Sequence, residues 1–254
     1  MSYSEHAKAT VNIVVTGPDG KVLRVIEGEG PDPFGLGFLD IIHSNVRGLL
    51  SSITMTDVFN RPHTFNIFTP SPSSLLGYLV PGFCLTNCPN AGLTPPNGPG
   101  IWLYSGVPFT GVANGWIFYV GSGIFPPYLI TGLSHSPPVV NLGTSTPSSP
   151  GDIVYQLYSV SQSITNTLSS PVNVRTVMLV GAFYGTLSAS PVYMPVTFYV
   201  FDPPIVFSPG ATMTVTVTLS FPIGIAARPA PTATTAVQPT TTTTASPISF
   251  RLGV

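Results

Sequence analysis

The chain has 254 residues, a mean hydropathy of +0.40 and a formal net charge of −1, and only 7% of its residues are charged. Ordinary soluble domains carry about 25% charged residues, so this chain lacks the basic surface that nucleic-acid binding requires. Because no uninterrupted apolar run reaches the ~18–20 residues of a membrane helix, the sequence also predicts no membrane span.

The few charges are concentrated near the N-terminus. Seven of the nine acidic and five of the eight basic residues lie within residues 1–61, and residues 62–151 contain none. A surface with so little charge favours self-contact. It suits either a subunit that other subunits cover or a secreted protein solubilised by Ser, Thr and Asn. The segment MSYSEHAKAT lacks the apolar core of a signal peptide, which favours the subunit.

The first predicted element is a β-hairpin. The segments VNIVV (11–15) and VLRVI (22–26) are rich in β-branched residues, and they flank Thr16–Lys21. Within that linker, Pro18-Asp19-Gly20 combines a fixed φ, an Asx hydrogen bond and a glycine that adopts positive φ. This combination predicts a tight turn.

One helix is predicted, over residues 33–50. Asp32 can cap it and Pro33 suits its first position. An apolar stripe at helical spacing predicts that the helix lies on a sheet or on another subunit. The stripe comprises Phe34, Phe38, Ile41, Ile42, Val46, Leu49 and Leu50.

A second hairpin and a neutral β region follow. Residues 53–59 and 63–68 flank Asn60-Arg61-Pro62 and are predicted to pair. Residues 69–152 are dominated by Pro, Gly, Ser and Asn, and short strands are predicted at their aromatic islands. These islands are residues 101–104, 116–120 and 128–130.

The two cysteines, Cys84 and Cys88, lie in this neutral region and form a candidate disulfide. A bridge requires Cα atoms within about 7 Å of each other, and two free thiols are the alternative. Two cysteines without a nearby histidine are too few for a structural zinc site, which uses four ligands.

Aromatic residues cluster in the same charge-free region. They form the core of a small β layer, a contact with another subunit, or a surface that stacks on sugars, since aromatic side chains dominate interface hot spots. The candidate interface residues in this cluster are Trp102, Tyr104, Trp116, Phe118, Tyr119 and Tyr128.

The C-terminal third predicts four strands, at residues 153–166, 172–184, 192–201 and 211–221. In the last strand, apolar residues from Met213 to Phe221 alternate with Thr and Ser. Strict alternation predicts one buried and one solvent-facing side.

Residues 226–247 are low-complexity Thr/Pro/Ala sequence, which cannot bury a core by itself. In the following segment, ISFRLGV, alternate apolar residues predict a strand that adds to the sheet of another subunit. Ile248, Phe250 and Leu252 are therefore further interface candidates.

The chain shows no constellation for catalysis. It lacks a Gly-x-Ser-x-Gly nucleophile motif and a phosphate-binding Gly-x4-Gly-Lys loop, and its four histidines have no metal-ligand spacing. Asp152 and Asp202 lie at strand ends next to prolines, where turn hydrogen bonding is the simplest role. We expect no enzyme activity, cofactor or metal. With so few titrating groups, we also expect a melting temperature that is nearly constant from about pH 3 to about pH 7.

The order of turns and strands resembles the closing β-sandwich unit of minor virion proteins from tailed bacteriophages and archaeal viruses. The similarity covers about half of the chain, residues 11–60 and 153–221. The matching features are the DGKV hairpin followed by GPDPFGLGFLDII, Ser170–Val174, the buried strand Val177–Gly185, Pro203–Val206, and the Pro209-Gly210 turn into Thr212–Phe221.

This resemblance implies a capsid turret, tail hub or spike component located in the virion. It implies contacts with other copies of the chain and with other virion proteins. The scattered basic residues and the net charge of −1 predict no contact with nucleic acid. The alternative is a secreted or cell-surface carbohydrate-binding adhesion module, and a host-surface glycan is a further candidate partner.

The expected fold is all-β, with β-sandwich or jelly-roll-like domains, one N-terminal helix and an extended C-terminal arm. Four regions are expected: residues 1–68 with the hairpins and helix, the neutral region 69–152, the sandwich strands 153–225 and the arm 226–254.

Overall fold

The structure is a computed structural model, and the part of it described here is all-β and contains no helix. The described residues are 8–30, 52–57, 62–66, 78–80, 83–85, 98–107, 116–117, 127–149, 151–183 and 192–225. The helix predicted over 33–50 and the arm 226–254 lie outside these residues.

The largest sheet, which we call sheet A, is antiparallel and has six strands. Its strand order is β10-β11-β14-β1-β2, and β9 also pairs with β11. The strands are β1 (Lys8–Thr16), β2 (Val22–Gly30), β9 (Ser134–His135), β10 (Val139–Thr144), β11 (Ile153–Thr165) and β14 (Thr212–Ile225).

A second antiparallel sheet, sheet B, has five strands in the order β13-β12-β6-β5, with β7 also paired to β12. Its strands are β5 (Tyr78–Val80), β6 (Phe83–Cys84), β7 (Gly100–Tyr104), β12 (Val172–Phe183) and β13 (Val192–Phe207). A small third sheet contains β3 (Ser52–Asp57), β4 (Pro62–Asn66) and β8 (Trp116–Ile117).

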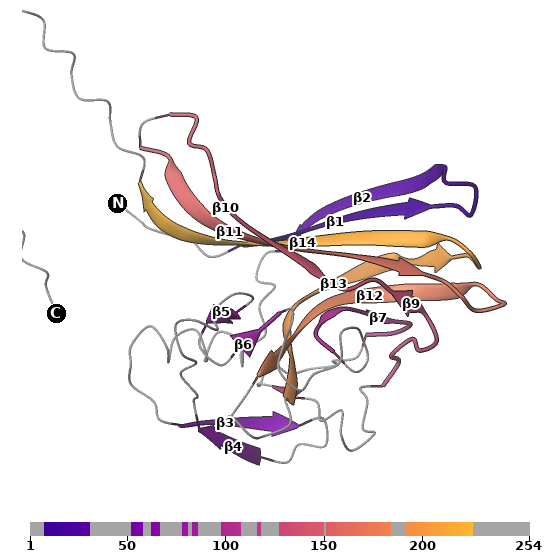
Figure 1. Ribbon diagram of the computed structural model, residues 1–254, viewed down its shortest axis with the longest axis horizontal. Helices are drawn as coiled ribbons and strands as arrows, with labels where there is room; N and C mark the ends of the chain where they lie inside the picture. The colour runs from indigo at the N-terminus through magenta and orange to yellow at the C-terminus, as the bar shows by residue number, and fades with distance from the viewer. Residues whose placement is uncertain are drawn as a thin grey trace, which may run out of the picture.

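Sheets A and B form two layers around a common apolar core, an arrangement consistent with a β-sandwich (Figure 1). The alternation of β14 directs its apolar residues inward, where Met213, Val215, Val217 and Leu219 are buried. Sheet B contributes residues of β7, β12 and β13 to the same cluster. Burying a large aliphatic or aromatic side chain contributes about 1.5–3 kcal/mol, so this shared core holds the layers together.

Both predicted hairpins are present among the described residues. β1 pairs with β2, and β3 pairs with β4, in antiparallel register. In the first turn the N–H of Gly17 donates to the carbonyl of Lys21 at 2.8 Å, and Gly20 has a φ of 79°. The turn chemistry read from Pro18-Asp19-Gly20 therefore determines the geometry of this hairpin.

Strand β13 extends beyond the predicted end at residue 201, through Pro203 and Pro204 to Phe207. Proline has no backbone N–H to donate to a neighbouring strand. It is therefore unfavourable in a central strand, which pairs on both sides, but an edge strand tolerates it. Among the described strands, β13 pairs only with β12 and is an edge strand. The prolines are therefore compatible with pairing, and the expected strand end was placed too early.

The close approach of the two layers leaves no room for a side chain at Gly28. A β-carbon at this position would overlap the phenol ring of Tyr199, which comes from β13 in the other sheet. We expect Gly28→Ala to lower the free energy of unfolding by about 1–2 kcal/mol, because overpacking displaces the ring. Urea denaturation of Gly28→Ala with and without Tyr199→Leu would test this. If the smaller side chain restores no stability, the overlap is not the cause.

Strands from different sequence regions share each sheet. β1 and β2 lie in the N-terminal region 1–68, β10 lies in the neutral region 69–152, and β11 and β14 lie in the region 153–225, yet all belong to sheet A.

Among the described residues, no helix has the length and apolar character needed to cross a bilayer.

Candidate interaction surfaces

Of the aromatic interface candidates, Trp102 and Tyr104 are completely buried within the chain. They pack with Cys84, Met178 and Tyr193 in a second apolar cluster. The ring of Trp102 lies 5.9 Å from that of Tyr193, centroid to centroid. Burial also raises the pKa of Tyr104. These two residues are part of the core and have no surface to offer a partner.

Tyr128 is different, because its side chain is 59% exposed. Its φ is 68°, a left-handed conformation that aromatic residues rarely adopt. The backbone is held there by the N–H of Ser105, which donates to the Tyr128 carbonyl at 2.9 Å. The ring lies against Gly106, where a β-carbon would come within 2.8 Å of it. Tyr128 therefore remains available to a partner.

The other candidate positions are only partly described. Trp116 lies in β8, but its side chain is not described, and Phe118, Tyr119, Ile248, Phe250 and Leu252 lie outside the described residues. Cys84 is buried and disulfide-bonded. Cys88, the other cysteine of the chain, is outside the part that the structure describes.

The two isolated carboxylates act in local structure. Asp152 accepts hydrogen bonds from the backbone N–H groups of Ser148 and Ser149 and from the Ser148 hydroxyl, at 2.6–2.9 Å. The Ser148 hydroxyl bond is the largest of the effects that lower the pKa of Asp152. Asp202 lies 3.5 Å from the guanidinium of Arg175 on the surface, where ion pairs contribute little stability.

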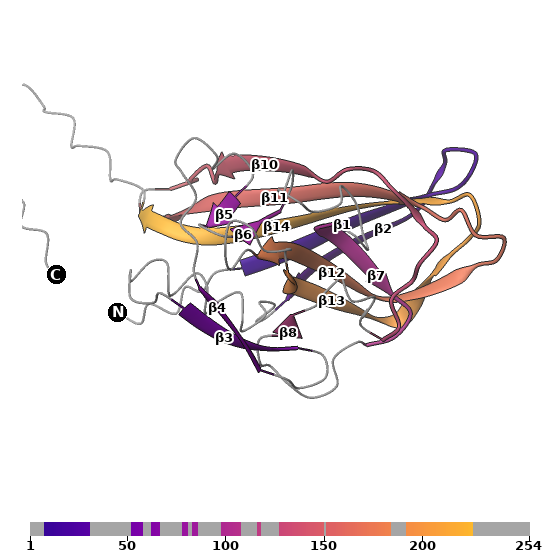
Figure 2. The same ribbon diagram turned by 60° about the horizontal axis from the view of Figure 1, so that its bottom comes forward.

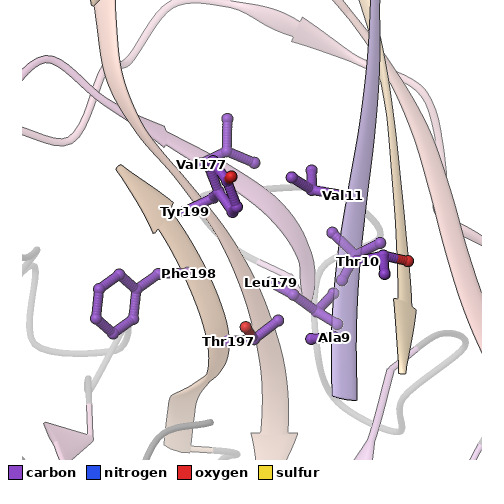
Figure 3. Close-up of a pocket in the computed structure, with 9 residues that line it drawn as sticks. Ala9, Thr10, Val11, Val177, Leu179, Thr197, Phe198 and Tyr199 are labelled. Carbon is purple, nitrogen blue, oxygen red and sulfur yellow. The ribbon is translucent and has the colours of Figure 1, made fainter. Parts of the chain in front are cut away.

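The gap between the layers is too small for a ligand. Ala9 and Val11 of β1 face Val177 and Leu179 of β12, and the space between them has a volume of about 10 Å³ (Figure 3). A single water requires about 10–15 Å³ by this measure. This gap is a packing defect of the core rather than a binding pocket.

One buried and one half-buried polar side chain were not identified from the sequence. The Gln162 carbonyl accepts the N–H of Ile101 at 2.6 Å, and its amide donates to the Ser136 carbonyl at 2.6 Å. It therefore connects β11 of sheet A with β7 of sheet B and with the segment before β10. The signal was present in the alternation, which places Gln162 on the same side of the strand as Val160 and Ile164.

His135 is the second of these polar side chains. Burial lowers its pKa from 6.5 to about 4, and its Nδ1 atom has no hydrogen-bond partner. Because the sequence around it reads as a loop, its burial beside β11 was not expected. The neutral form is the one that this site accommodates.

The outer side of sheet A carries a continuous ladder of hydroxyl groups. Serine and threonine side chains of β11 meet threonine side chains of β14 in four cross-strand pairs, with oxygen separations of 2.8–3.1 Å. The pairs are Ser159–Thr218, Ser161–Thr216, Ser163–Thr214 and Thr165–Thr212. On β11 and β14 this side is polar without charge, as the alternation in β14 predicted.

The same side of sheet A has a shallow depression of about 400 Å³. Hydroxyl, amide and carboxylate groups line it, supplied by Thr10, Asn12, Glu27, Thr216 and Thr218. The Asn12 amide donates to the Glu27 carboxylate at 3.2 Å. This depression is wide enough for a small polar ligand, but its open shape encloses little of it.

Both edges of sheet A present large aliphatic side chains. On β2, Val22, Leu23 and Val25 are more than half exposed, and on β10, Val139 and Leu142 are 56% and 68% exposed. Each strand has one paired side and no second partner among the described strands (Figure 2). Strand β10 was not predicted from the sequence, although the VVNL segment between Pro138 and Gly143 has the composition of a strand.

The described residues contain no group of three or more His, Cys, Asp or Glu side chains arranged for a metal ion.

No protein-family model matches the chain, and neither a curated protein nor a solved structure matches it. A functional proposal therefore depends on the surfaces of the chain and on its sequence pattern.

Proposed function

We propose that this chain is a virion structural protein that assembles with other copies of itself, as a minor capsid, turret, tail or spike component. The observation that supports this most is the pair of edges of sheet A, β2 and β10, which have no second partner among the described strands and carry exposed aliphatic side chains. An exposed edge strand offers unpaired N–H and C=O groups, and proteins that remain monomeric usually protect it.

The composition supports the same proposal. With 7% charged residues and a net charge of −1, the chain has few charges to keep copies apart. On β11 and β14 the outer side of sheet A obtains its polarity from hydroxyl pairs instead, and hydroxyl groups can be covered at a smaller desolvation cost than charged groups.

The resemblance to virion proteins gives this assembly its proposed location. The turn and strand order that carries the resemblance falls largely on β11 to β14 and on the hairpin of β1 and β2. A jelly-roll-like sandwich, an N-terminal helix and an extended arm that contacts neighbouring subunits belong to the same proposal.

The test of assembly is the mass of the purified protein. We expect size-exclusion chromatography with light scattering to give a mass of two or more times 26.7 kDa and negative-stain images to show rings or closed particles. The association should depend little on salt, because the proposed contacts are uncharged. A monomer across the micromolar range, with or without 1 M salt, would contradict the proposal.

The second candidate, a carbohydrate-binding adhesion module, is favoured by the depression near Thr10 and Glu27 and by exposed Tyr128. Hydroxyl, amide and carboxylate groups hydrogen-bond sugar hydroxyls, and aromatic rings stack on sugars. This candidate predicts a monomer that is retained on a polysaccharide matrix, and it predicts that the Tyr128→Ala variant is not retained. An oligomer without such retention would exclude it.

A further inference from the structure

We infer that the open edge of β10 accepts residues Ile248–Val254 of a second copy as an additional antiparallel or parallel strand. This inference rests on the proposed self-assembly and specifies the two surfaces that meet. Addition of an extended segment to a sheet edge is a common mode of recognition, in which backbone hydrogen bonds give affinity and alternate side chains give specificity.

Of the two edges of sheet A, β10 is the less protected. Charged side chains discourage pairing at sheet edges. Strand β2 carries three of them, Arg24, Glu27 and Glu29, whereas β10 (VVNLGT) carries none. At the same time, Leu142 on β10 is 68% exposed. An unprotected edge with an exposed leucine is a favourable site for a further strand.

The two sides of β10 match the two sides of the incoming segment. Val140 packs against the shared core, and Leu142 lies on the same side of the sheet, opposite Tyr158. Asn141 lies on the other side, opposite Ser159 of the hydroxyl ladder. The segment has the same two-sided character, since its apolar residues are Ile248, Phe250, Leu252 and Val254 and its intervening residues are Ser249, Arg251 and Gly253.

This match determines which side of the segment faces the inner side of sheet A. Its apolar row extends the inner side of sheet A and covers Leu142, while Ser249 and Arg251 extend the polar outer side. A segment of seven residues also fits the six residues of β10. A shift by one residue would expose the whole apolar row, so the pairing parity is defined.

The arm begins at the end of the sheet where β10 lies. Ile225, the last residue of β14, is opposite Ile153 at the start of β11, and Gln156 of the same strand is opposite Thr144 of β10 (Figure 1). Residues 226–247 then supply 22 residues of Thr/Pro-rich sequence. An extended Pro-rich chain spans about 3 Å per residue, or about 65 Å here, which is long enough to reach an adjacent subunit.

The pairing is tested by disulfide trapping between two different variants. One protein carries Leu142→Cys and the other carries one introduced cysteine at a position from 248 to 254, each in addition to Cys84 and Cys88, and the two are mixed and oxidised. We expect a mixed dimer on non-reducing gels with Ile248→Cys, Phe250→Cys or Leu252→Cys, and at least a fivefold lower yield with Ser249→Cys or Arg251→Cys, which point to the other side of the sheet.

The edge itself is tested by a matched pair of substitutions, Leu142→Lys on β10 and Leu23→Lys on β2. Both leucines are more than 60% exposed, so neither change should unfold the sandwich, which far-UV circular dichroism would verify. We expect Leu142→Lys to raise the concentration for half-assembly about tenfold or more, because the ammonium would face the apolar row. Leu23→Lys should leave this concentration within about twofold.

The outcomes separate the two levels of the proposal. If the unaltered protein is monomeric, the proposed self-assembly itself fails. If it assembles but Leu142→Lys has no effect, or only Leu23→Lys weakens assembly, the assembly stands and the assignment of β10 is wrong. A trapped bond that forms only within one chain carrying both cysteines would show that the segment folds back on its own β10, which overturns the exchange between copies.

Discussion

Replacing Gln162 by leucine is expected to lower the free energy of unfolding by about 2–5 kcal/mol. The Gln162 side chain is 1% exposed and bonds the Ile101 N–H and the Ser136 carbonyl, both at 2.6 Å. Leucine has a similar volume but leaves one backbone donor and one backbone acceptor without these partners. Each buried group that loses its partner costs about 1–3 kcal/mol. Urea denaturation of the two proteins measures the difference directly.

The matched control is Gln156→Leu, on the same strand. The Gln156 amide donates to the Gly143 carbonyl at 2.7 Å, but in exposed surroundings, where water can replace the lost partner. We therefore expect a change below about 1 kcal/mol. Equal losses at the two positions would show that the connection between the sheets is not what makes Gln162 important.

Acidification from pH 7 to pH 4 is expected to lower the melting temperature by about 5–10 °C, through His135. Its pKa is about 4 in the folded protein because burial disfavours the charged imidazolium, whereas an exposed histidine in the unfolded chain has a pKa near 6.5. Between these values the unfolded state binds a proton that the folded state does not. Stability is therefore complete above about pH 6.5 and decreases as the pH falls toward 4, by about 2–3 kcal/mol.

His135→Leu removes this titration and serves as the control. Its melting temperature should stay nearly constant between pH 7 and pH 4, and it should lose little stability at pH 7 because the Nδ1 atom of His135 has no hydrogen-bond partner to lose. Asp152 acts in a different window. Its lowered pKa contributes stability that is present above about pH 4 and is lost as the pH falls further. A pH profile of His135→Leu that matches the unaltered protein would refute the role of His135.

This expectation corrects the one drawn from composition alone, which was a nearly constant melting temperature from about pH 3 to about pH 7. The sequence contains four histidines, and their number says nothing about which of them is buried. His135 is half-buried, with its Nδ1 atom enclosed, where β9 pairs with β11 at Ile164. The segment around His135 has no recognisable strand pattern, so neither this pairing nor the lowered pKa could be anticipated from the sequence.

Alternation predicted the strands best where one side is apolar and the other is rich in hydroxyl groups. In β14 it gave both the buried row from Met213 to Leu219 and the threonines of the ladder. The same logic, applied position by position to β11, would also have placed Gln162 inside. Side chains alternate between the two faces of a strand, so Gln162 shares its face with Val160 and Ile164. Its burial follows if this alternation is given more weight than the polarity of the side chain.

The interaction surfaces were less accessible from the sequence. A cluster containing Trp102 and Tyr104 suits a core as well as an interface, and only the packing of β7 against β12 shows that both are buried. Which strands form the edges depends on strand order, which places β2 and β10 at opposite edges of sheet A. Strand order is set by contacts distant in sequence, and no local pattern reveals it.

The pairing of β1 with β14 also sets the time at which sheet A can be completed during translation. Thr16 lies opposite Thr212, 196 residues later in the chain, and synthesis at about 5–20 residues per second separates them by roughly 10–40 s. Strand β14 occupies the centre of the sheet between β1 and β11. The hairpin of β1 and β2 therefore lacks its neighbour β14 during most of translation. Strands β10 and β11 join the same sheet as this hairpin only when β14 emerges from the ribosome.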